Sequence, residues 1–102
     1  MAKRPVKVTI SYCAECGYEP QTLALAQALM LQFREELAEI ELIPWQDGAF
    51  DVVVDGELVH SMFREGGFPE HGLVIDAVRR HQVTARAHNE IPATNRQSGP
   101  GI

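Results

Sequence analysis

The sequence predicts one α/β domain in which a mixed four-stranded sheet packs with two helices. Three short segments alternate apolar and polar residues, as half-buried strands do, and a fourth returns from a tight turn. Two longer segments carry apolar residues at helical spacing. The 102 residues, 45% of them hydrophobic, suit a single domain with its own core. The predicted order is strand, helix, strand, strand, strand, helix.

The first strand is predicted over residues 6–12, where apolar and polar side chains alternate. The first helix is predicted over Gln21–Ala38, which lacks glycine and proline and is rich in good helix formers. Its expected buried stripe is Ala26, Met30, Phe33, Leu37 and Ile40, with Leu23 and Leu29 on the flanks. A strand that follows this helix should pair with the first strand in parallel, through a right-handed crossover.

Later in the chain, Asp55-Gly56 is a strong signal for a two-residue hairpin turn between antiparallel strands. The later strands are predicted at Glu39–Ile43, Phe50–Val54 and Glu57–Phe63, and the second helix at Glu70–Arg86 with Val74, Ala77, Val78 and Ala85 on its stripe. Trp45 is expected in a loop, and His81 is expected as a packed imidazole. The domain is predicted over residues 1–86 and a disordered tail over 87–102.

The charge and the apolar runs exclude several classes of partner. A net charge of -5 argues against nucleic acid, because phosphate binding needs clustered cations. No apolar run approaches the ~20 residues of a membrane span, so no membrane partner is expected. Residues 1–5 precede no apolar segment of the kind found in a signal peptide. We therefore expect a cytoplasmic protein.

The two cysteines, Cys13 and Cys16, are separated by only two residues and lie between the first strand and the first helix. In a chain without a secretory signal such a pair is typical of redox chemistry or metal binding. Zinc needs four ligands, which only the histidines at positions 60, 71, 81 and 88 could complete, so the sequence favours redox chemistry over a metal site or an inert pair. A Cys-x-x-Cys motif at this place indicates a thioredoxin-like fold.

Three segments together carry a family resemblance: residues 12–18 (YCAECGY), 48–59 (GAFDVVVDGELV) and 64–69 (REGGFP). With these segments the chain resembles the Rdx family, the selenoprotein W-like group of thioredoxin-like proteins, over about residues 6–86. It resembles a cysteine-containing homologue of bacterial type, with Cys16 where selenoprotein W carries selenocysteine. Met62-Phe63 departs from the basic residues expected there. The resemblance implies a thiol redox protein linked to glutathione or peroxide metabolism.

The predicted function is that of a small thiol–disulfide redox protein whose site residues are Cys13 and Cys16. No bound cofactor is expected, and the expected partners are glutathione, as a co-substrate, or protein thiols. The alternative is a non-enzymatic interaction module in which the pair senses oxidation. The position of the motif favours Cys13 as the attacking thiol, whereas the resemblance favours Cys16. We expect Cys16 to attack and Cys13 to resolve.

Three residues bear on how reactive these thiols are. Pro20 suits the start of a helix that begins after Gly17, although a helix that starts at the cysteine pair and kinks at Pro20 is the alternative. Glu15 and Glu19 add negative charge, which disfavours a neighbouring thiolate. The sequence therefore predicts thiols that are less acidic than those of a strong oxidase, so that the thiolate is only partly formed at neutral pH.

Phe68, in the segment Gly66–Pro69, is expected either in the core or beside the thiols.

Overall fold

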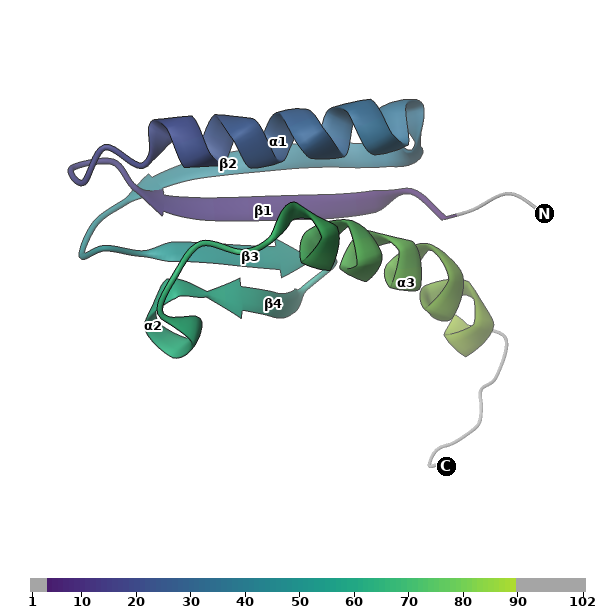
Figure 1. The fold of residues 1–102 in the computed structure, drawn as a ribbon. Coiled ribbons are helices and arrows are strands. Elements are labelled where there is room, and N and C mark those ends of the chain that lie inside the picture. Colours follow the sequence, from purple (N-terminus) through teal and green to yellow (C-terminus); the bar gives the residue numbers. More distant parts are fainter. Residues whose placement is uncertain (1–3, 90–102) are drawn as a thin grey trace.

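A mixed four-stranded sheet organises residues 4–89, the part of the chain that the structure, a computed structural model, describes (Figure 1). Its strands are β1 (Val6–Cys13), β2 (Leu37–Trp45), β3 (Phe50–Val54) and β4 (Glu57–Ser61). The strand order is β2-β1-β3-β4, in which β1 pairs with β2 in parallel and with β3 antiparallel, and β3 pairs with β4 antiparallel. The predicted α/β fold with a mixed sheet is confirmed.

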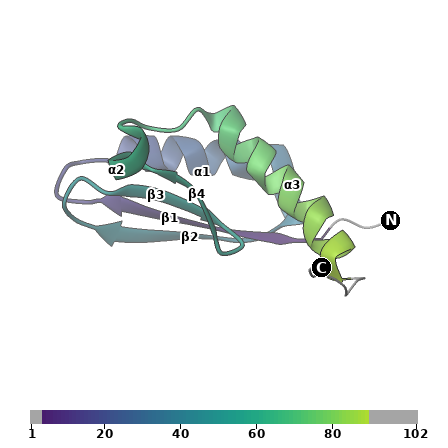
Figure 2. The same ribbon diagram turned by 90° about the horizontal axis from the view of Figure 1, so that it is seen from below.

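The two long helices, α1 (Glu19–Phe33) and α3 (His71–Asn89), lie on the same face of the sheet (Figure 2). A short helix, α2 (Met62–Glu65), follows β4. Between the sheet and the two long helices lies one apolar core, which comprises Val6, Val8, Ile10, Leu25, Leu29, Phe33, Phe50, Val52, Val54, Val74, Ala77 and Val78. The molecule is therefore a two-layer structure, and the alternating residues of β1 and β3 fix which face of the sheet is buried.

Helix α1 is shorter than predicted, and its buried stripe differs. It ends at Phe33. A short 3-10 helix, η1 (Arg34–Glu36), follows it and leads directly into β2. Met30, expected on the stripe, is 54% exposed, because the buried face is formed by Thr22, Leu25, Ala26, Leu29 and Phe33. The helix is apolar on nearly every side, so spacing alone could not select the buried face. Leu37 and Ile40 belong to β2.

Strand β4 ends at Ser61, two residues before its predicted end. The Ser61 N–H donates to Glu65 Oε1 at 2.9 Å, and this bond ends the strand and begins helix α2, which the sequence did not predict. Gly66, with φ of 81°, ends α2 in the left-handed region that favours glycine. The buried His60 ring fixes the next segment, since its Nε2 lies 2.6 Å from the Gly67 carbonyl oxygen.

Two further expectations need correction at the ends of elements. Trp45 is the last residue of β2 and not a loop residue. Helix α3 runs to Asn89, three residues beyond its predicted end. Its predicted stripe is confirmed at Val74, Ala77 and Val78. His81 is half-buried at the edge of this stripe, where its Nε2 lies 2.6 Å from Glu57 Oε1. The side chain of Ala85 and residues 90–102 of the predicted tail lie outside the described part of the chain.

None of the helices within residues 4–89 has the length and apolar composition that crossing a membrane requires.

The backbone of Arg34 leads to a stability prediction. Its φ of 53° places a residue with a Cβ in a region that costs roughly 1–2 kcal/mol. Glycine removes this cost but loses about 0.5–1 kcal/mol to the entropy of the unfolded chain. We expect Arg34→Gly to raise the free energy of unfolding by up to about 1 kcal/mol in urea titrations. The matched control Glu35→Gly, at a residue without a positive φ, should lower it, and a loss of stability in Arg34→Gly would contradict the prediction.

The Asp55 carboxylate, in the hairpin turn between β3 and β4, leads to a second prediction. Partial burial opposes its ionisation, but the hydrogen bond from the Lys7 N–H at 3.0 Å and the ion pair with Arg4 outweigh burial, so the pKa of Asp55 lies below its ordinary value. A pKa lowered by folding stabilises the fold above the unfolded-state pKa of about 3.9, and this stabilisation is lost as the pH falls through the folded-state pKa.

We therefore expect Asp55→Asn to lower the free energy of unfolding at pH 7. The difference from the wild type should begin to shrink below about pH 4 in parallel urea titrations and should disappear below the folded-state pKa of Asp55, where both side chains are uncharged. Asparagine tolerates the left-handed turn position and still accepts from Lys7, so the variant isolates the charge. A difference that is independent of pH would contradict this assignment.

Candidate redox-active site

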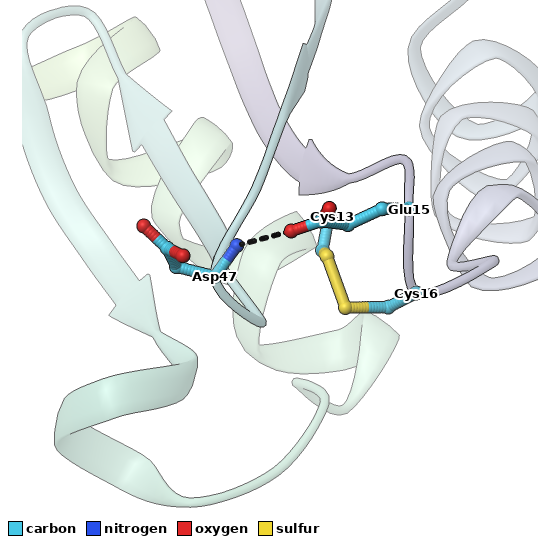
Figure 3. The surroundings of a disulfide bond; sticks show 4 residues. All are labelled: Cys13, Glu15, Cys16 and Asp47. Carbon is cyan, nitrogen blue, oxygen red and sulfur yellow. Dashed lines mark hydrogen bonds between the residues drawn. A yellow bond between two sulfur atoms is a disulfide. The ribbon is translucent and has the colours of Figure 1, made fainter.

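The two cysteines lie at one end of the sheet and are joined by a disulfide bond (Figure 3). Cys13 is the last residue of β1, and Cys16 lies in the turn formed by residues 14–17, which we call the Cys turn. The Cα atoms of the pair are 5.3 Å apart. The Gly17 N–H donates to the Ala14 carbonyl oxygen at 3.1 Å, and Gly17 has a φ of 79° that favours glycine. The local sequence thus closes a turn tight enough for the two sulfurs to bond.

The two cysteines differ in burial. Cys13 is 0% exposed, whereas Cys16 is an exposed residue. Main-chain hydrogen bonds hold the buried side of the pair: the Cys13 N–H donates to the Ala49 carbonyl oxygen at 2.8 Å, and the Ala14 N–H donates to the Trp45 carbonyl oxygen at 3.0 Å. Strands β2 and β3 therefore fix Cys13 from both sides, and Cys16 is the residue that solvent can reach.

Helix α1 begins after the Cys turn and not at the cysteines. Its first residue is Glu19, and Pro20 lies in its first turn without a kink, so the prediction of a helix that begins after Gly17 is confirmed and the kinked alternative is wrong. The Thr22 N–H and hydroxyl both donate to the Tyr18 carbonyl oxygen, at 3.0 and 2.9 Å. Because the field of a helix dipole fades beyond the first turn, α1 gives the Cys16 thiolate little stabilisation.

Two carboxylate-bearing residues lie beside the disulfide. Glu15, between the cysteines, accepts a hydrogen bond at its Oε2 from the Asp47 N–H at 3.3 Å, as Figure 3 shows. This bond joins the Cys turn to the loop between β2 and β3. Residues 11–30 contain no Lys, Arg or His. The immediate surroundings of the pair are therefore acidic, which disfavours a thiolate.

Phe68 lies at the border between the core and the site. Its ring packs edge-to-face on both Tyr18 and Phe50, with ring centroids 5.0 Å apart in each pair. The residue nevertheless remains 41% exposed. Phe68 is therefore not a fully buried core residue: one neighbour, Phe50, belongs to the core, and the other, Tyr18, adjoins the Cys turn.

The sequence predicted a loop over residues 45–48, and the structure confirms it at residues 46–48, but sequence reasoning did not reveal that this loop faces the Cys turn. Asp47 and Gly48 both have a positive φ, of 65° and 74°, and form the turn between β2 and β3 that brings Ala49 to Cys13. The signal was present, since Asp47-Gly48 is the same type of turn dipeptide as Asp55-Gly56. The dipeptide predicts a turn, but it does not predict that this turn lies against the end of β1.

Histidine side chains do not complete a metal site with the cysteines in the part of the chain that the structure describes. Among the side chains that the structure describes, which do not include those of residues 84–89, no three of His, Cys, Asp or Glu lie close enough together to hold a metal ion. His60 and His81 are instead hydrogen-bonded within the fold, to Gly67 and Glu57.

Several known proteins are similar to the chain in sequence. Migration and invasion enhancer 1 is 39% identical in Bos taurus and 36% in Mus musculus, over 75 residues in each case, or 74% of this chain. The matched region spans 64% of the length of these two relatives, which is less than two thirds. Selenoprotein W of Danio rerio is 42% identical over 65 residues, which cover 62% of this chain and 74% of that protein.

Solved structures and a family model agree with this similarity. A protein from Bordetella parapertussis superimposes with a TM-score of 0.71 and 31% identity, over 76% of this chain and 99% of that one. A selenoprotein W-related protein from Vibrio cholerae has the same TM-score and 30% identity, over 74% and 95% of the two chains. The model of the Rdx family matches residues 7–80, which include both cysteines. The chain belongs to the Rdx family, and its Cys13–Cys16 pair gives it the character of a thiol-based redox protein.

Proposed function

We propose that the chain is a thiol–disulfide exchange protein in which Cys16 forms the mixed disulfide and Cys13 resolves it. The observation that supports this assignment is the difference in burial, since Cys13 is 0% exposed and Cys16 is exposed. An incoming thiolate must approach a sulfur in line with the disulfide bond, and access decides which sulfur it attacks. The exposed residue is therefore the point of attack.

The reaction has two steps in each direction. When the oxidised chain accepts electrons, a substrate thiolate attacks Cys16 Sγ, a new S–S bond forms, and Cys13 leaves as a thiolate. A second substrate thiolate then attacks the substrate sulfur of the mixed disulfide, which releases the oxidised substrate and the Cys16 thiolate. In reverse, the Cys16 thiolate attacks a substrate disulfide, and Cys13 displaces the remaining substrate thiol.

Glutathione and protein thiols are the proposed exchange partners, and a peroxide is a proposed oxidant. With a peroxide, the Cys16 thiolate attacks one oxygen, the O–O bond breaks, and the other oxygen leaves as hydroxide or alkoxide that is protonated to water or alcohol. The Cys13 thiol then condenses with the resulting Cys16 sulfenic acid to form the disulfide and a molecule of water. A pair that cycles between dithiol and disulfide suits a reducing compartment, so we propose the cytoplasm as the place of action.

Turnover distinguishes this proposal from a module that only senses oxidation. The experiment is a glutathione-coupled assay of disulfide and peroxide reduction, with the Cys13→Ser, Cys16→Ser double variant as the control. Turnover above that control supports an exchange protein. A rate equal to the control would contradict catalysis and would leave the pair as a sensor.

The assignment of roles predicts different outcomes for the single cysteine variants. Cys13→Ser removes the resolving thiol, so Cys16 should accumulate a stable mixed disulfide with oxidised glutathione. Cys16→Ser leaves only the buried Cys13, and its mixed disulfide should form at least about tenfold more slowly. Mass spectrometry of the intact proteins, after acid quenching at timed intervals, measures both rates. Faster labelling of Cys16→Ser would reverse the roles.

The charge of Glu15 predicts a change in thiol reactivity. In reduced protein, Glu15→Gln removes a negative charge beside Cys16, while the Gln amide oxygen can still accept from the Asp47 N–H. Loss of that charge removes the repulsion of a neighbouring thiolate, so alkylation near pH 7 should become faster by roughly two- to fivefold. The measurement is alkylation rate against pH, with Glu35→Gln as the control at an exposed residue of the distant 3-10 turn. An unchanged or slower rate would show that another charge governs the site.

A further inference from the structure

We propose that Cys16 exchanges preferentially with cysteines of partner proteins whose surrounding segment is both apolar and basic, and only secondarily with glutathione. This inference rests on the proposed function and names the substrate class of the same site. It follows from three features that surround the Cys turn: exposed aromatic side chains, an apolar cavity and a local excess of carboxylates.

Aromatic residues lie at both ends of the Cys turn. At the start of the turn, the Ala14 N–H is bound by the carbonyl of Trp45, a residue that is 58% exposed. At the end of the turn, Tyr18 packs against Phe68, which is 41% exposed. We call Trp45, Tyr18 and Phe68 the aromatic rim. Exposed aromatic residues next to a reactive group are typical of the centres of protein interfaces, since they bury much area at little entropic cost.

An apolar cavity of about 120 Å³ lies next to this rim, between the first turns of α1 and the segment that precedes α3. Most of its lining is apolar, with Phe68 and Pro69 from one segment and Ala24 and Leu25 from α1, and Gln21 and His71 add two polar side chains. The cavity is large enough for one aliphatic or small aromatic side chain. Glutathione has no apolar side chain to place there, whereas a protein segment with a Leu or Phe near its cysteine does.

The charges beside Cys16 define the partner further. The segments that meet at the site, residues 14–19 and 46–49, carry Glu15, Glu19 and Asp47, all exposed, and no Lys, Arg or His. Figure 3 shows the Glu15 carboxylate beside the disulfide, where it accepts from the Asp47 N–H, while the Asp47 carboxylate points away from the sulfurs. Glutathione brings two carboxylates and one ammonium group, so these residues repel its net negative charge. A cysteine flanked by Lys or Arg is attracted instead.

The experiment measures how fast peptide thiols reduce the oxidised full-length chain. Three peptides share one cysteine: the first has Phe and two Lys nearby, the second has Phe and two Glu, and the third has Gly and two Lys. Glutathione is the fourth thiol. Because flanking charges also change the thiolate fraction of each peptide, each rate is divided by the rate of the same thiol with the neutral bis(2-hydroxyethyl) disulfide.

In these corrected rates, the Phe–Lys peptide should exceed the Phe–Glu peptide and glutathione by about tenfold at low salt. It should exceed the Gly–Lys peptide by about fivefold. The gap between the Lys and Glu peptides should close in 0.5 M NaCl, because salt screens charges. Equal corrected rates for all four thiols, or a faster rate for glutathione, would overturn the inference.

Two variants test the apolar part of the surface. Trp45→Ala removes a residue of the aromatic rim, and Ala24→Leu places a larger side chain into the cavity. Each should lower the rate of the Phe–Lys peptide relative to the Gly–Lys peptide by about fivefold. Leu31→Ala is the matched control, since Leu31 is 57% exposed but lies near the far end of α1. An equal effect of the control would overturn the assignment of the surface.

A reaction with 2-mercaptoethanol separates this inference from the proposed function. This small uncharged thiol needs neither the aromatic rim nor a basic flank. If it forms a mixed disulfide at Cys16 while the peptides show no preference, the exchange function stands and the substrate class is wrong. If neither 2-mercaptoethanol nor any peptide reacts, the proposed function itself fails.

Discussion

The position of β1 between two neighbouring strands is the constraint on which the rest of the structure depends. β1 is hydrogen-bonded to β2 on one side and to β3 on the other, and it supplies three core residues, Val6, Val8 and Ile10. Its last residue is Cys13, whose N–H is bound by Ala49 just before β3. The sheet thus delivers one sulfur to a fixed, buried place. The other sulfur belongs to Cys16 in the Cys turn, outside the sheet. The disulfide therefore joins a buried strand end to an exposed turn.

The elements whose sequence carries a strong local signal could be predicted. The alternation in β1 and β3, the Asp55-Gly56 turn, the start of α1 near Pro20 and the buried stripe of α3 all agree with the structure. The cysteine pair could also be located, because its spacing limits the geometry to a turn. In each case the conformation is determined by residues that are close together in the sequence.

The remaining features depend on contacts between distant segments. The end of α1 was not predicted, because Arg34 adopts a positive φ that no sequence pattern favours. Strand β2 then begins at Leu37, the first residue that pairs with β1. Helix α2 depends on one side chain, Glu65, that binds the N–H of Ser61. At the site, the approach of Asp47 to Glu15 joins residues 32 positions apart. The local periodicity of the sequence contains no information about contacts between segments that lie far apart in the chain.

The outer edge of β2 has a consequence for how two molecules can meet. As the first strand in the order β2-β1-β3-β4, β2 leaves one row of main-chain groups without a strand partner in the described sheet, and such a row can recruit a strand from another chain. Pro44 interrupts the row because it has no N–H, and the exposed Glu39 and Glu41 of two copies would repel each other. The nine-residue edge is thereby protected against self-association and aggregation. The exposed Cys16 lies at the end of the same sheet, in a turn that is separate from this edge strand.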